Sequence, residues 1–493
     1  MNSARWVLLS LALAACLPFA ARAEDESKPK SVNYQAELND RLGKGITAEK
    51  NACVLLWKAF GPLPESSVPA AIFKRLGIQA PPKEGNYFIG IHRFLIDRLQ
   101  LDRSEFEGVY HQMHWAAKRP WAAKDYPLIG VWLKENEKPL AVVREATKRP
   151  DYYNPLIADK GETASGLLVG VPLPIVWKNR EITSALCARA MLRLNEGQSD
   201  EAWADLLACH RLARLAARGG TLIEAWGSDI IESIVSEAEL AYLDRAKLTS
   251  KQILERLKDL QGLPRMPAIA DALDLGERYV FMDALDLYRR GGWIDENRNV
   301  IDNANRSPEE LKALESIDWK SVRQSGNLWY DRMIAALRLP NRVERCDKLA
   351  IIEERLKALK SGTLDDGGNS PEDRQLGEIL SALLLPIVRN SQNRRERVGQ
   401  VHANVQLAFA LAAYQRDRGR YPAKLDDLSP KYFGVIPNDA FSGKPLTYRP
   451  AEKGYLLYSV GINGKDDGGR WYDDDPPGDD PRVQMPLPPI QKE

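Results

Sequence analysis

The sequence predicts a mainly α-helical body followed by a small C-terminal α+β module, in which a long helix precedes an antiparallel hairpin. Helix-start signals recur along the body: Thr249-x-x-Gln252 and Ser307-Pro308-Glu309-Glu310 both have the capping-box pattern. Apolar residues at 398–412 repeat with the helical period and predict the long helix. Two β-prone runs follow it, Leu446–Tyr448 and Tyr455–Val460, and these predict the hairpin.

The N-terminus is typical of a bacterial signal peptide. Arg5 supplies a positive charge, an apolar run extends from Trp6 to Ala15, and Ala21-Arg22-Ala23 offers the small residues that a signal peptidase requires. The apolar run is shorter than the ~20 residues of a spanning helix. We therefore expect cleavage near Ala23 and an extracytoplasmic chain, periplasmic or secreted, with no transmembrane helix. The alternative is a lipoprotein anchored through Cys16, since Leu13-Ala14-Ala15-Cys16 fits the pattern before a lipidated cysteine.

Composition narrows the class of protein. The chain is 44% hydrophobic and 28% charged, which is typical of a globular protein. A net charge of +1 argues against nucleic acid as a partner, because nucleic-acid binding requires a strongly basic face. Four cysteines follow the predicted cleavage site without forming a CxxC pair, so we expect buried thiols: Cys53, Cys187, Cys209 and Cys346.

Composition shifts divide the chain into regions. Prolines interrupt the stretch before residue 181, and the segment SGTLDDGGNSPED before the long helix is rich in glycine, serine and aspartate, as linkers are. The expected regions are a signal peptide at 1–23, a flexible lead-in at 24–45, an irregular α-rich region at 46–180, a helical domain at 181–360, a linker at 361–375, an α+β module at 376–470 and an acidic, proline-rich disordered tail at 471–493.

Residues 181–218 predict a helical hairpin. Ile182–Leu194 has the pattern of one helix, and Gly197-Gln198-Ser199-Asp200-Glu201-Ala202 forms a turn and the start of a second. This hairpin resembles a single tetratricopeptide repeat unit. Arg189 and Arg193 depart from that pattern, because they occupy positions that are usually apolar or aromatic. No second 34-residue copy is evident, and an ordinary helical hairpin is the alternative interpretation.

The C-terminal module contains a series of ordered motifs. The long helix ends at Gly419-Arg420-Tyr421-Pro422, the segment 439–448 (DAFSGKPLTY) follows, and Tyr458-Ser459-Val460-Gly461-Ile462-Asn463-Gly464 precedes the paired Gly468-Gly469. In this order the motifs resemble the globular part of the major pseudopilin of type II secretion systems. The resemblance implies a helix packed on a small antiparallel sheet, with calcium in the last loop. The polar segment 390–397 (NSQNRRER) replaces the apolar helix through which pseudopilins assemble, so we expect the fold without filament assembly.

Calcium is the cofactor that the acidic loop suggests. Calcium takes six to eight oxygen ligands, so its site requires acidic and amide side chains on a tightly curled loop. Glycines permit that curl. The candidate ligands are Asn463, Asp466, Asp467, Asp473 and Asp475. A solvated acidic turn is the alternative.

A zinc site is the catalytic alternative. Glu107, His111 and His114 have i, i+4 and i+7 spacing and would share one face of a helix. Two histidines and a carboxylate can hold Zn²⁺ with a position left for water, as in hydrolases. The spacing is not that of HExxH, and such residues are also common on a solvated helix surface.

These observations lead to two functional hypotheses. The preferred hypothesis is an exported, non-catalytic binding or assembly protein of the bacterial cell envelope, with a protein partner and a pseudopilin-like module that binds calcium. The alternative is a secreted metal-dependent hydrolase that uses Glu107, His111 and His114.

Overall fold

The computed structural model describes residues 32–62, 68–102, 106–158, 166–294, 300–301, 307–361, 372–385 and 388–489. The described chain is mainly helical, with a small three-stranded antiparallel sheet near the C-terminus. The predicted signal peptide, Cys16 and most of the predicted linker lie outside the described residues. None of the helices in the described ranges combines the length and the apolar character that crossing a membrane requires.

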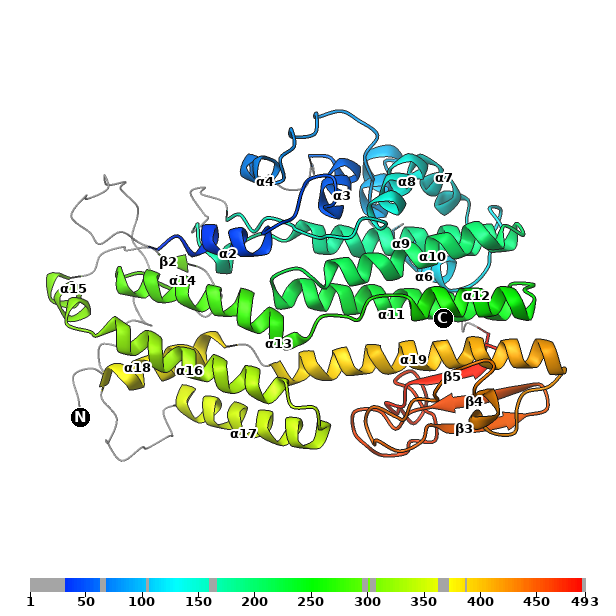
Figure 1. Ribbon diagram of the computed structural model, residues 1–493. Coiled ribbons are helices and arrows are strands. Elements are labelled where there is room, and N and C mark those ends of the chain that lie inside the picture. Colours follow the sequence, from blue (N-terminus) through cyan, green and yellow to red (C-terminus); the bar gives the residue numbers. More distant parts are fainter. Residues whose placement is uncertain are drawn as a thin grey trace.

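Short helices form the N-terminal part. They cover one side of the long central helices (Figure 1). The elements are α2 (Tyr34–Leu42), α3 (Ala52–Phe60), α4 (Ala70–Arg75), α5 (Ile91–Arg93), the π-helical η1 (Phe94–Arg98), α6 (Phe106–Lys118), α7 (Pro127–Glu135), α8 (Glu137–Ala146) and the 3-10 helix η3 (Leu168–Gly170).

The flexible lead-in predicted at 24–45 is wrong for its described part. Leu38 in α2 is fully buried, and the side chain of Asn39 both donates to and accepts from the backbone of Leu156, each at 2.8 Å. The lead-in looked polar because α2 buries only one face, and its contacts lie more than a hundred residues away along the chain. Nothing in the local sequence reveals such a partner.

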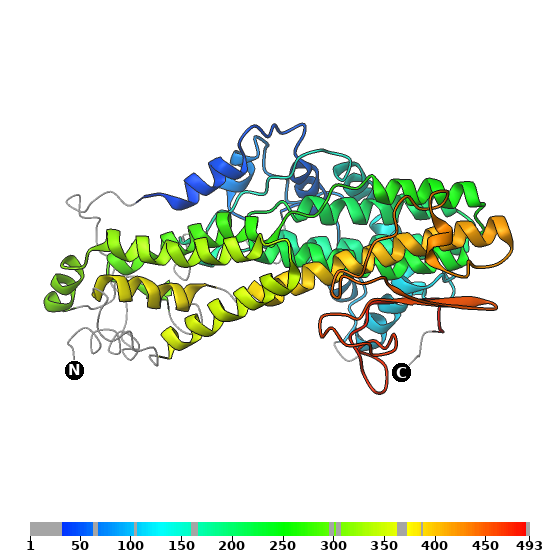
Figure 2. The same cartoon turned by 60° about the horizontal axis from the view of Figure 1, so that its bottom comes forward.

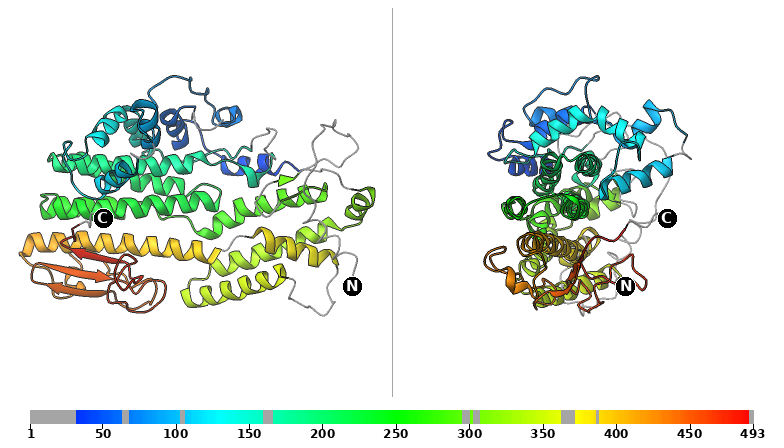
Figure 3. Two further views of the ribbon diagram at one scale, coloured as in Figure 1. Left: turned by 180° about the vertical axis from the view of Figure 1, so that it is seen from behind. Right: turned by 90° about the vertical axis from the view of Figure 1, so that its right-hand side faces the viewer.

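The central layer consists of α9 (Pro174–Asn195), α10 (Ser199–Ala216), α11 (Leu222–Arg245) and α12 (Ser250–Gln261). The hairpin predicted at 181–218 is present as α9 and α10, with α9 starting eight residues earlier than Ile182. Figure 3 shows these helices lying lengthwise, and the molecule is longer along them than across them. Their interiors supply much of one continuous hydrophobic core.

A second group of helices forms the end of the molecule that carries α15 (Figure 1). Its core includes Phe281, Trp329, Leu349 and Leu380. The elements are α13 (Ile269–Ala272), the π-helical η4 (Leu273–Glu277), α14 (Arg278–Arg289), β1 (Trp293–Ile294), β2 (Val300–Ile301), α15 (Pro308–Glu315), α16 (Trp319–Leu337), α17 (Arg342–Lys360) and α18 (Glu372–Leu384). Strands β1 and β2 pair antiparallel.

The C-terminal part starts with α19 (Val388–Arg418), followed by the 3-10 helix η5 (Leu425–Leu428) and the strands β3 (Thr447–Ala451), β4 (Gly454–Tyr458) and β5 (Arg482–Met485). The predicted hairpin is β3 and β4, which pair antiparallel. Two predicted boundaries change. Helix α18 packs on α16 and belongs to the helical body, so the module begins at α19 rather than at residue 376. The tail expected to be disordered from residue 471 contains β5, which pairs with β4.

Helix α19 joins the sheet to the helical body. It packs against α11 and α12 on one side and against β5 on the other. Val405, Phe409 and Leu411 are fully buried in the same core that includes Tyr242 of α11 and Leu457 of β4. The acidic loop between β4 and β5 is therefore held at the surface of a structure whose core continues into the body.

Candidate metal centre in the acidic loop

The acidic loop is closed by the sheet at both of its ends. Tyr458 at the end of β4 pairs with Arg482 at the start of β5, so the residues between them form one compact excursion. Figure 2 shows this segment, in red, beside the strands. Gly461 has φ of 67°, and a Cβ there would lie 2.3 Å from the carbonyl oxygen of Asp479. Only glycine allows the two ends of the loop to approach so closely.

Three carboxylates converge inside the loop. Asp467, Asp479 and Asp480 each place an oxygen within 4.8 Å of the others. Asp480 is fully buried, and its Oδ2 accepts hydrogen bonds from the backbone nitrogens of Asp467 at 3.0 Å and Gly469 at 2.8 Å. The loop therefore fixes the Asp480 carboxylate with backbone donors.

Asp479 is held in the same way. Its Oδ2 accepts from the backbone nitrogens of Ile462 at 2.9 Å and Asn463 at 3.1 Å. The other oxygens, Oδ1 of Asp479 and Oδ1 of Asp480, are buried without a hydrogen-bond partner in the described part of the chain. A buried carboxylate oxygen without a partner is costly. Because calcium is bound by such oxygens, this donor set suits a calcium ion.

The electrostatics of the loop also favour a bound cation. Burial and, to a smaller extent, the neighbouring Asp467 carboxylate together raise the pKa of Asp480 to about 6. Arg470 lies 3.7 Å from Asp467 Oδ1, and its side chain is 43% exposed, so solvent weakens this pair. A divalent cation between the three carboxylates would offset the repulsion that raises this pKa.

Of the five predicted calcium ligands, the structure brings only Asp467 into the group. Asn463 supports it, because its amide donates to Asp467 Oδ2 at 2.9 Å. Asp466 accepts from the Tyr458 hydroxyl at 3.0 Å, and Asp473 and Asp475 are exposed outside the group. Hydrogen bonds within the loop, rather than position in the sequence, therefore decide which of these residues join the group of converging carboxylates.

Sequence reasoning missed Asp479 and Asp480, because they lie farther from the paired Gly468-Gly469 than Asp473 and Asp475, in a segment expected to be disordered. A signal was present: Arg482-Val483-Gln484-Met485 directly after Pro481 alternates polar and apolar residues, which is typical of a half-buried strand. Asp479 and Asp480 come just before this strand. Because the strand pairs antiparallel with β4, they lie beside the residues that directly follow β4.

The predicted zinc residues lie on α6, and all three are exposed. Within the described ranges, the groups with metal-ligand geometry do not include Glu107, His111 or His114. The ring of His111 lies 6.0 Å from that of Trp115. Burial lowers the pKa of His114, and the nearby Lys118 lowers it further. The geometry offers the hydrolase hypothesis no converging ligands.

A second histidine and glutamate group lies in the helical body. His210 of α10 is fully buried, with Nδ1 at 2.8 Å from Glu232 and Nε2 at 3.0 Å from Glu239, both on α11. Its ring lies 5.6 Å from that of His402 on α19. Arg214 forms an ion pair with Glu232 and lies 3.4 Å from Nε2 of His402. Burial, and after it the charge of Arg214, holds the pKa of His402 well below its usual range. Because Arg214 already supplies a cation there, we interpret the cluster as a buried charge network that holds α19 against the body.

Comparison of the chain with models of known protein families, with curated proteins and with solved structures gave no match. The resemblances to a pseudopilin and to a tetratricopeptide unit therefore stay predictions.

Proposed function

We propose that this chain is an exported, non-catalytic binding or assembly protein of the bacterial cell envelope, and that its C-terminal module binds calcium. The observation that carries the calcium part is the convergence of Asp467, Asp479 and Asp480, two of whose buried oxygens have no hydrogen-bond partner within the described ranges. Backbone carbonyls and water complete the six to eight oxygens that calcium takes. The envelope and partner parts rest on the signal-peptide pattern and the two resemblances.

Calcium in this loop would act on the fold of the module. The loop spans the connection between β4 and β5, and β5 contacts α19. A cation that neutralises the three carboxylates therefore stabilises the pairing of β5 and, through it, the contact of the sheet with the long helix. The role proposed for calcium is structural, and it fits a module that presents a rigid surface to a protein partner.

The test is thermal unfolding of the full-length mature chain in calcium, in magnesium and in a chelator. Binding to the folded state alone raises the free energy of unfolding by about 2.7 kcal/mol at a hundredfold excess over Kd. We expect a rise in Tm with calcium and a smaller one with magnesium, which prefers a smaller octahedral site. Asp467→Asn and Asp479→Asn should abolish the calcium response.

Asp475→Asn is the matched control, because it removes one carboxylate from the same loop at an exposed position outside the group. This variant should keep the full calcium response. A response that is absent in the wild-type chain, or that survives both Asp467→Asn and Asp479→Asn, would show that the carboxylates do not bind calcium.

A further inference from the structure

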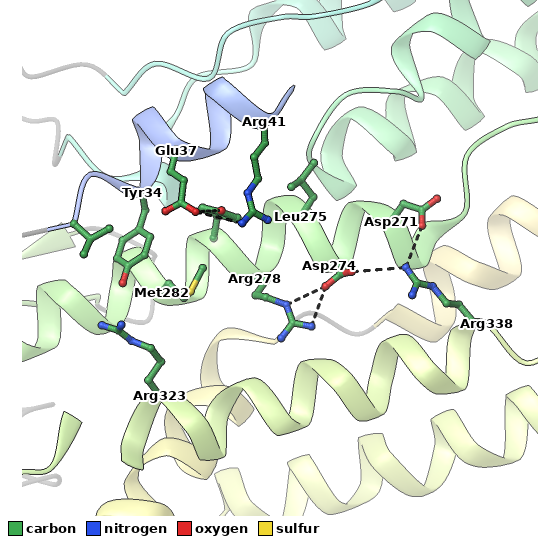
Figure 4. A pocket seen from close by; sticks show the side chains of 12 residues that line it. Tyr34, Glu37, Arg41, Asp271, Asp274, Leu275, Arg278, Met282, Arg323 and Arg338 are labelled. Carbon is green, nitrogen blue, oxygen red and sulfur yellow. Dashed lines mark hydrogen bonds and ion pairs between the residues drawn. The ribbon is translucent and has the colours of Figure 1, made fainter. Parts of the chain in front are cut away.

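A cavity of about 510 Å³ lies in the helical body, far along the chain from the acidic loop. It forms where α2 faces η4 and α14, with α16 on the opposite side (Figure 4). Its wall combines charged and apolar side chains, which is the composition of a site that binds a small molecule with one polar end.

Most of the charges on the wall are already paired with one another. Three arginines each lie within 3.4 Å of a carboxylate that also lines the cavity: Arg41 with Glu37, Arg278 with Asp274, and Arg338 with Asp271. The two charges of each pair neutralise one another, and the Nε of the remaining arginine, Arg323, has no hydrogen-bond partner among the described residues.

Arg323 and Tyr34 supply donors without acceptors. The Nε of Arg323 and the hydroxyl of Tyr34 are buried, and neither has a hydrogen-bond partner among the described residues. Figure 4 shows the two side chains on the same side of the cavity, Arg323 from α16 and Tyr34 from α2. Tyr34 is only 4% exposed, and burial raises the pKa of Tyr34, so its hydroxyl keeps its proton.

Two buried donors that face one cavity require an acceptor. Leaving both unpaired costs free energy, and a guanidinium binds an oxyanion with a planar fork that matches carboxylate or phosphate oxygens. Met282 forms an apolar part of the wall near these donors, and Leu275 forms another apolar part farther along the cavity (Figure 4). A ligand that satisfies the whole site has an oxyanion at one end and an apolar body at the other.

We propose that this cavity binds a small organic oxyanion, a carboxylate or phosphate attached to an apolar group, through Arg323 and the Tyr34 hydroxyl. The site is independent of the calcium loop and adds a ligand-binding activity to the helical body. The ligand enters with its oxyanion toward α16 and its apolar body against η4 and α14.

Calorimetric titration with benzoate, with the neutral isostere benzamide and with inorganic phosphate tests the site. We expect benzoate to bind at millimolar concentration or below, and benzamide at least about tenfold more weakly, since only the anion pairs with Arg323. Arg323→Gln should lower benzoate affinity at least about tenfold, and Tyr34→Phe by a smaller factor. Phosphate competing with benzoate would place the oxyanion, rather than the ring, at Arg323.

Lys320→Gln is the control, because it removes the same charge from the same helix at an exposed position outside the cavity. It should bind benzoate as the wild type does. Each variant must also keep the wild-type Tm, so that a loss of binding is not a loss of fold. The proposal is overturned if neither benzoate nor phosphate binds the wild-type chain at millimolar concentration, or if folded Arg323→Gln binds benzoate with unchanged affinity.

Discussion

At the scale of single residues, buried charge explains where this chain departs from the sequence patterns it resembles. Arg189 and Arg193 stand at positions that are apolar in tetratricopeptide units, and both reach the fully buried Asp205 on α10. Arg189 pairs with both carboxylate oxygens, at 2.9 and 2.7 Å. An ion pair therefore replaces the apolar contact between the two helices of the hairpin.

Asp205→Ala should destabilise the chain strongly. The substitution leaves the buried Arg189 without its carboxylate, and breaking a buried pair on one side costs about 3–5 kcal/mol. Urea unfolding of the purified protein measures the loss. Asp200→Ala is the comparison: it removes an exposed carboxylate from the same helix, one that pairs with Arg256, and should cost less than about 1 kcal/mol. Equal losses in the two variants would contradict the role of Asp205.

The calcium ligands show the limit of residue-level prediction. Asp467 could be found from the glycine-rich loop alone, because it lies among the residues that curl. Asp479 and Asp480 could not, since their place depends on β5 pairing with β4, a contact between distant parts of the sequence. Sequence spacing could not separate Asp473 and Asp475, which point to solvent, from the acids that converge.

At the scale of secondary-structure elements, the sequence predicted correctly those features whose hydrogen bonds join residues close together in the chain. The capping boxes predicted at Thr249 and Ser307 are both present, each with its reciprocal hydrogen bonds. Helix α2 and strand β5 escaped prediction because their stability comes from tertiary contacts rather than from local propensity. The boundary at α18 was missed for the same reason: its partner α16 lies earlier in the chain than the predicted linker.

The start of helix α11 predicts a dependence of stability on pH. Glu224 closes the capping box with Thr221, yet it is almost fully buried, and burial raises the pKa of Glu224 from 4.5 to about 7. Below pH 4.5 this carboxyl is protonated in both the folded and the unfolded chain. Between pH 4.5 and 7 only the unfolded chain loses its proton, so the free energy of unfolding falls as pH rises, by about 3 kcal/mol in total.

Glu224→Gln should remove this dependence, because the amide cannot ionise but its oxygen can still accept the hydrogen bonds of the cap. Free energies of unfolding at pH 5 and pH 8 measure the effect, and the variant should gain on the wild type at pH 8. Glu255→Gln, at an exposed position of α12, should change the pH profile little. If Glu224→Gln shifts stability equally at both pH values, ionisation of Glu224 is not the cause.

At the scale of the whole molecule, the hydrophobic core does not stop at the boundary between the helical body and the C-terminal module. The fully buried apolar residues of α19 from Val405 to Ala413 belong to one cluster with α10, α11, α12 and the sheet, whereas Val388 at its start belongs to the core of the second group of helices. The mainly helical class and the small antiparallel sheet were predicted correctly, because both follow from the periodicity of apolar residues. The predicted domain boundaries rested on composition, which does not show which surfaces pack together.

The location of the whole chain is a separate prediction. We expect the mature protein to begin at Glu24 and to be released from the cell envelope without detergent, because Ala21-Arg22-Ala23 supplies a signal-peptidase site. Mass spectrometry of the N-terminus and fractionation of cells measure this, and Cys16→Ser should leave both unchanged. Retention of the wild type on membranes, lost in Cys16→Ser, would instead establish the lipid anchor.

The return of the last strand to the core has a consequence for how the chain is made. Val483 and Met485 are buried in the main core, and the carbonyl oxygen of Pro488 accepts a hydrogen bond at 3.0 Å from Arg119, the residue that follows α6. A ribosome makes α19 and β5 after α11 and α12, so the faces of α11 and α12 that α19 covers stay bare until this later part of the chain has emerged. Premature termination between α12 and α19 leaves those apolar faces open to aggregation, and such products depend on chaperones or proteases for their removal.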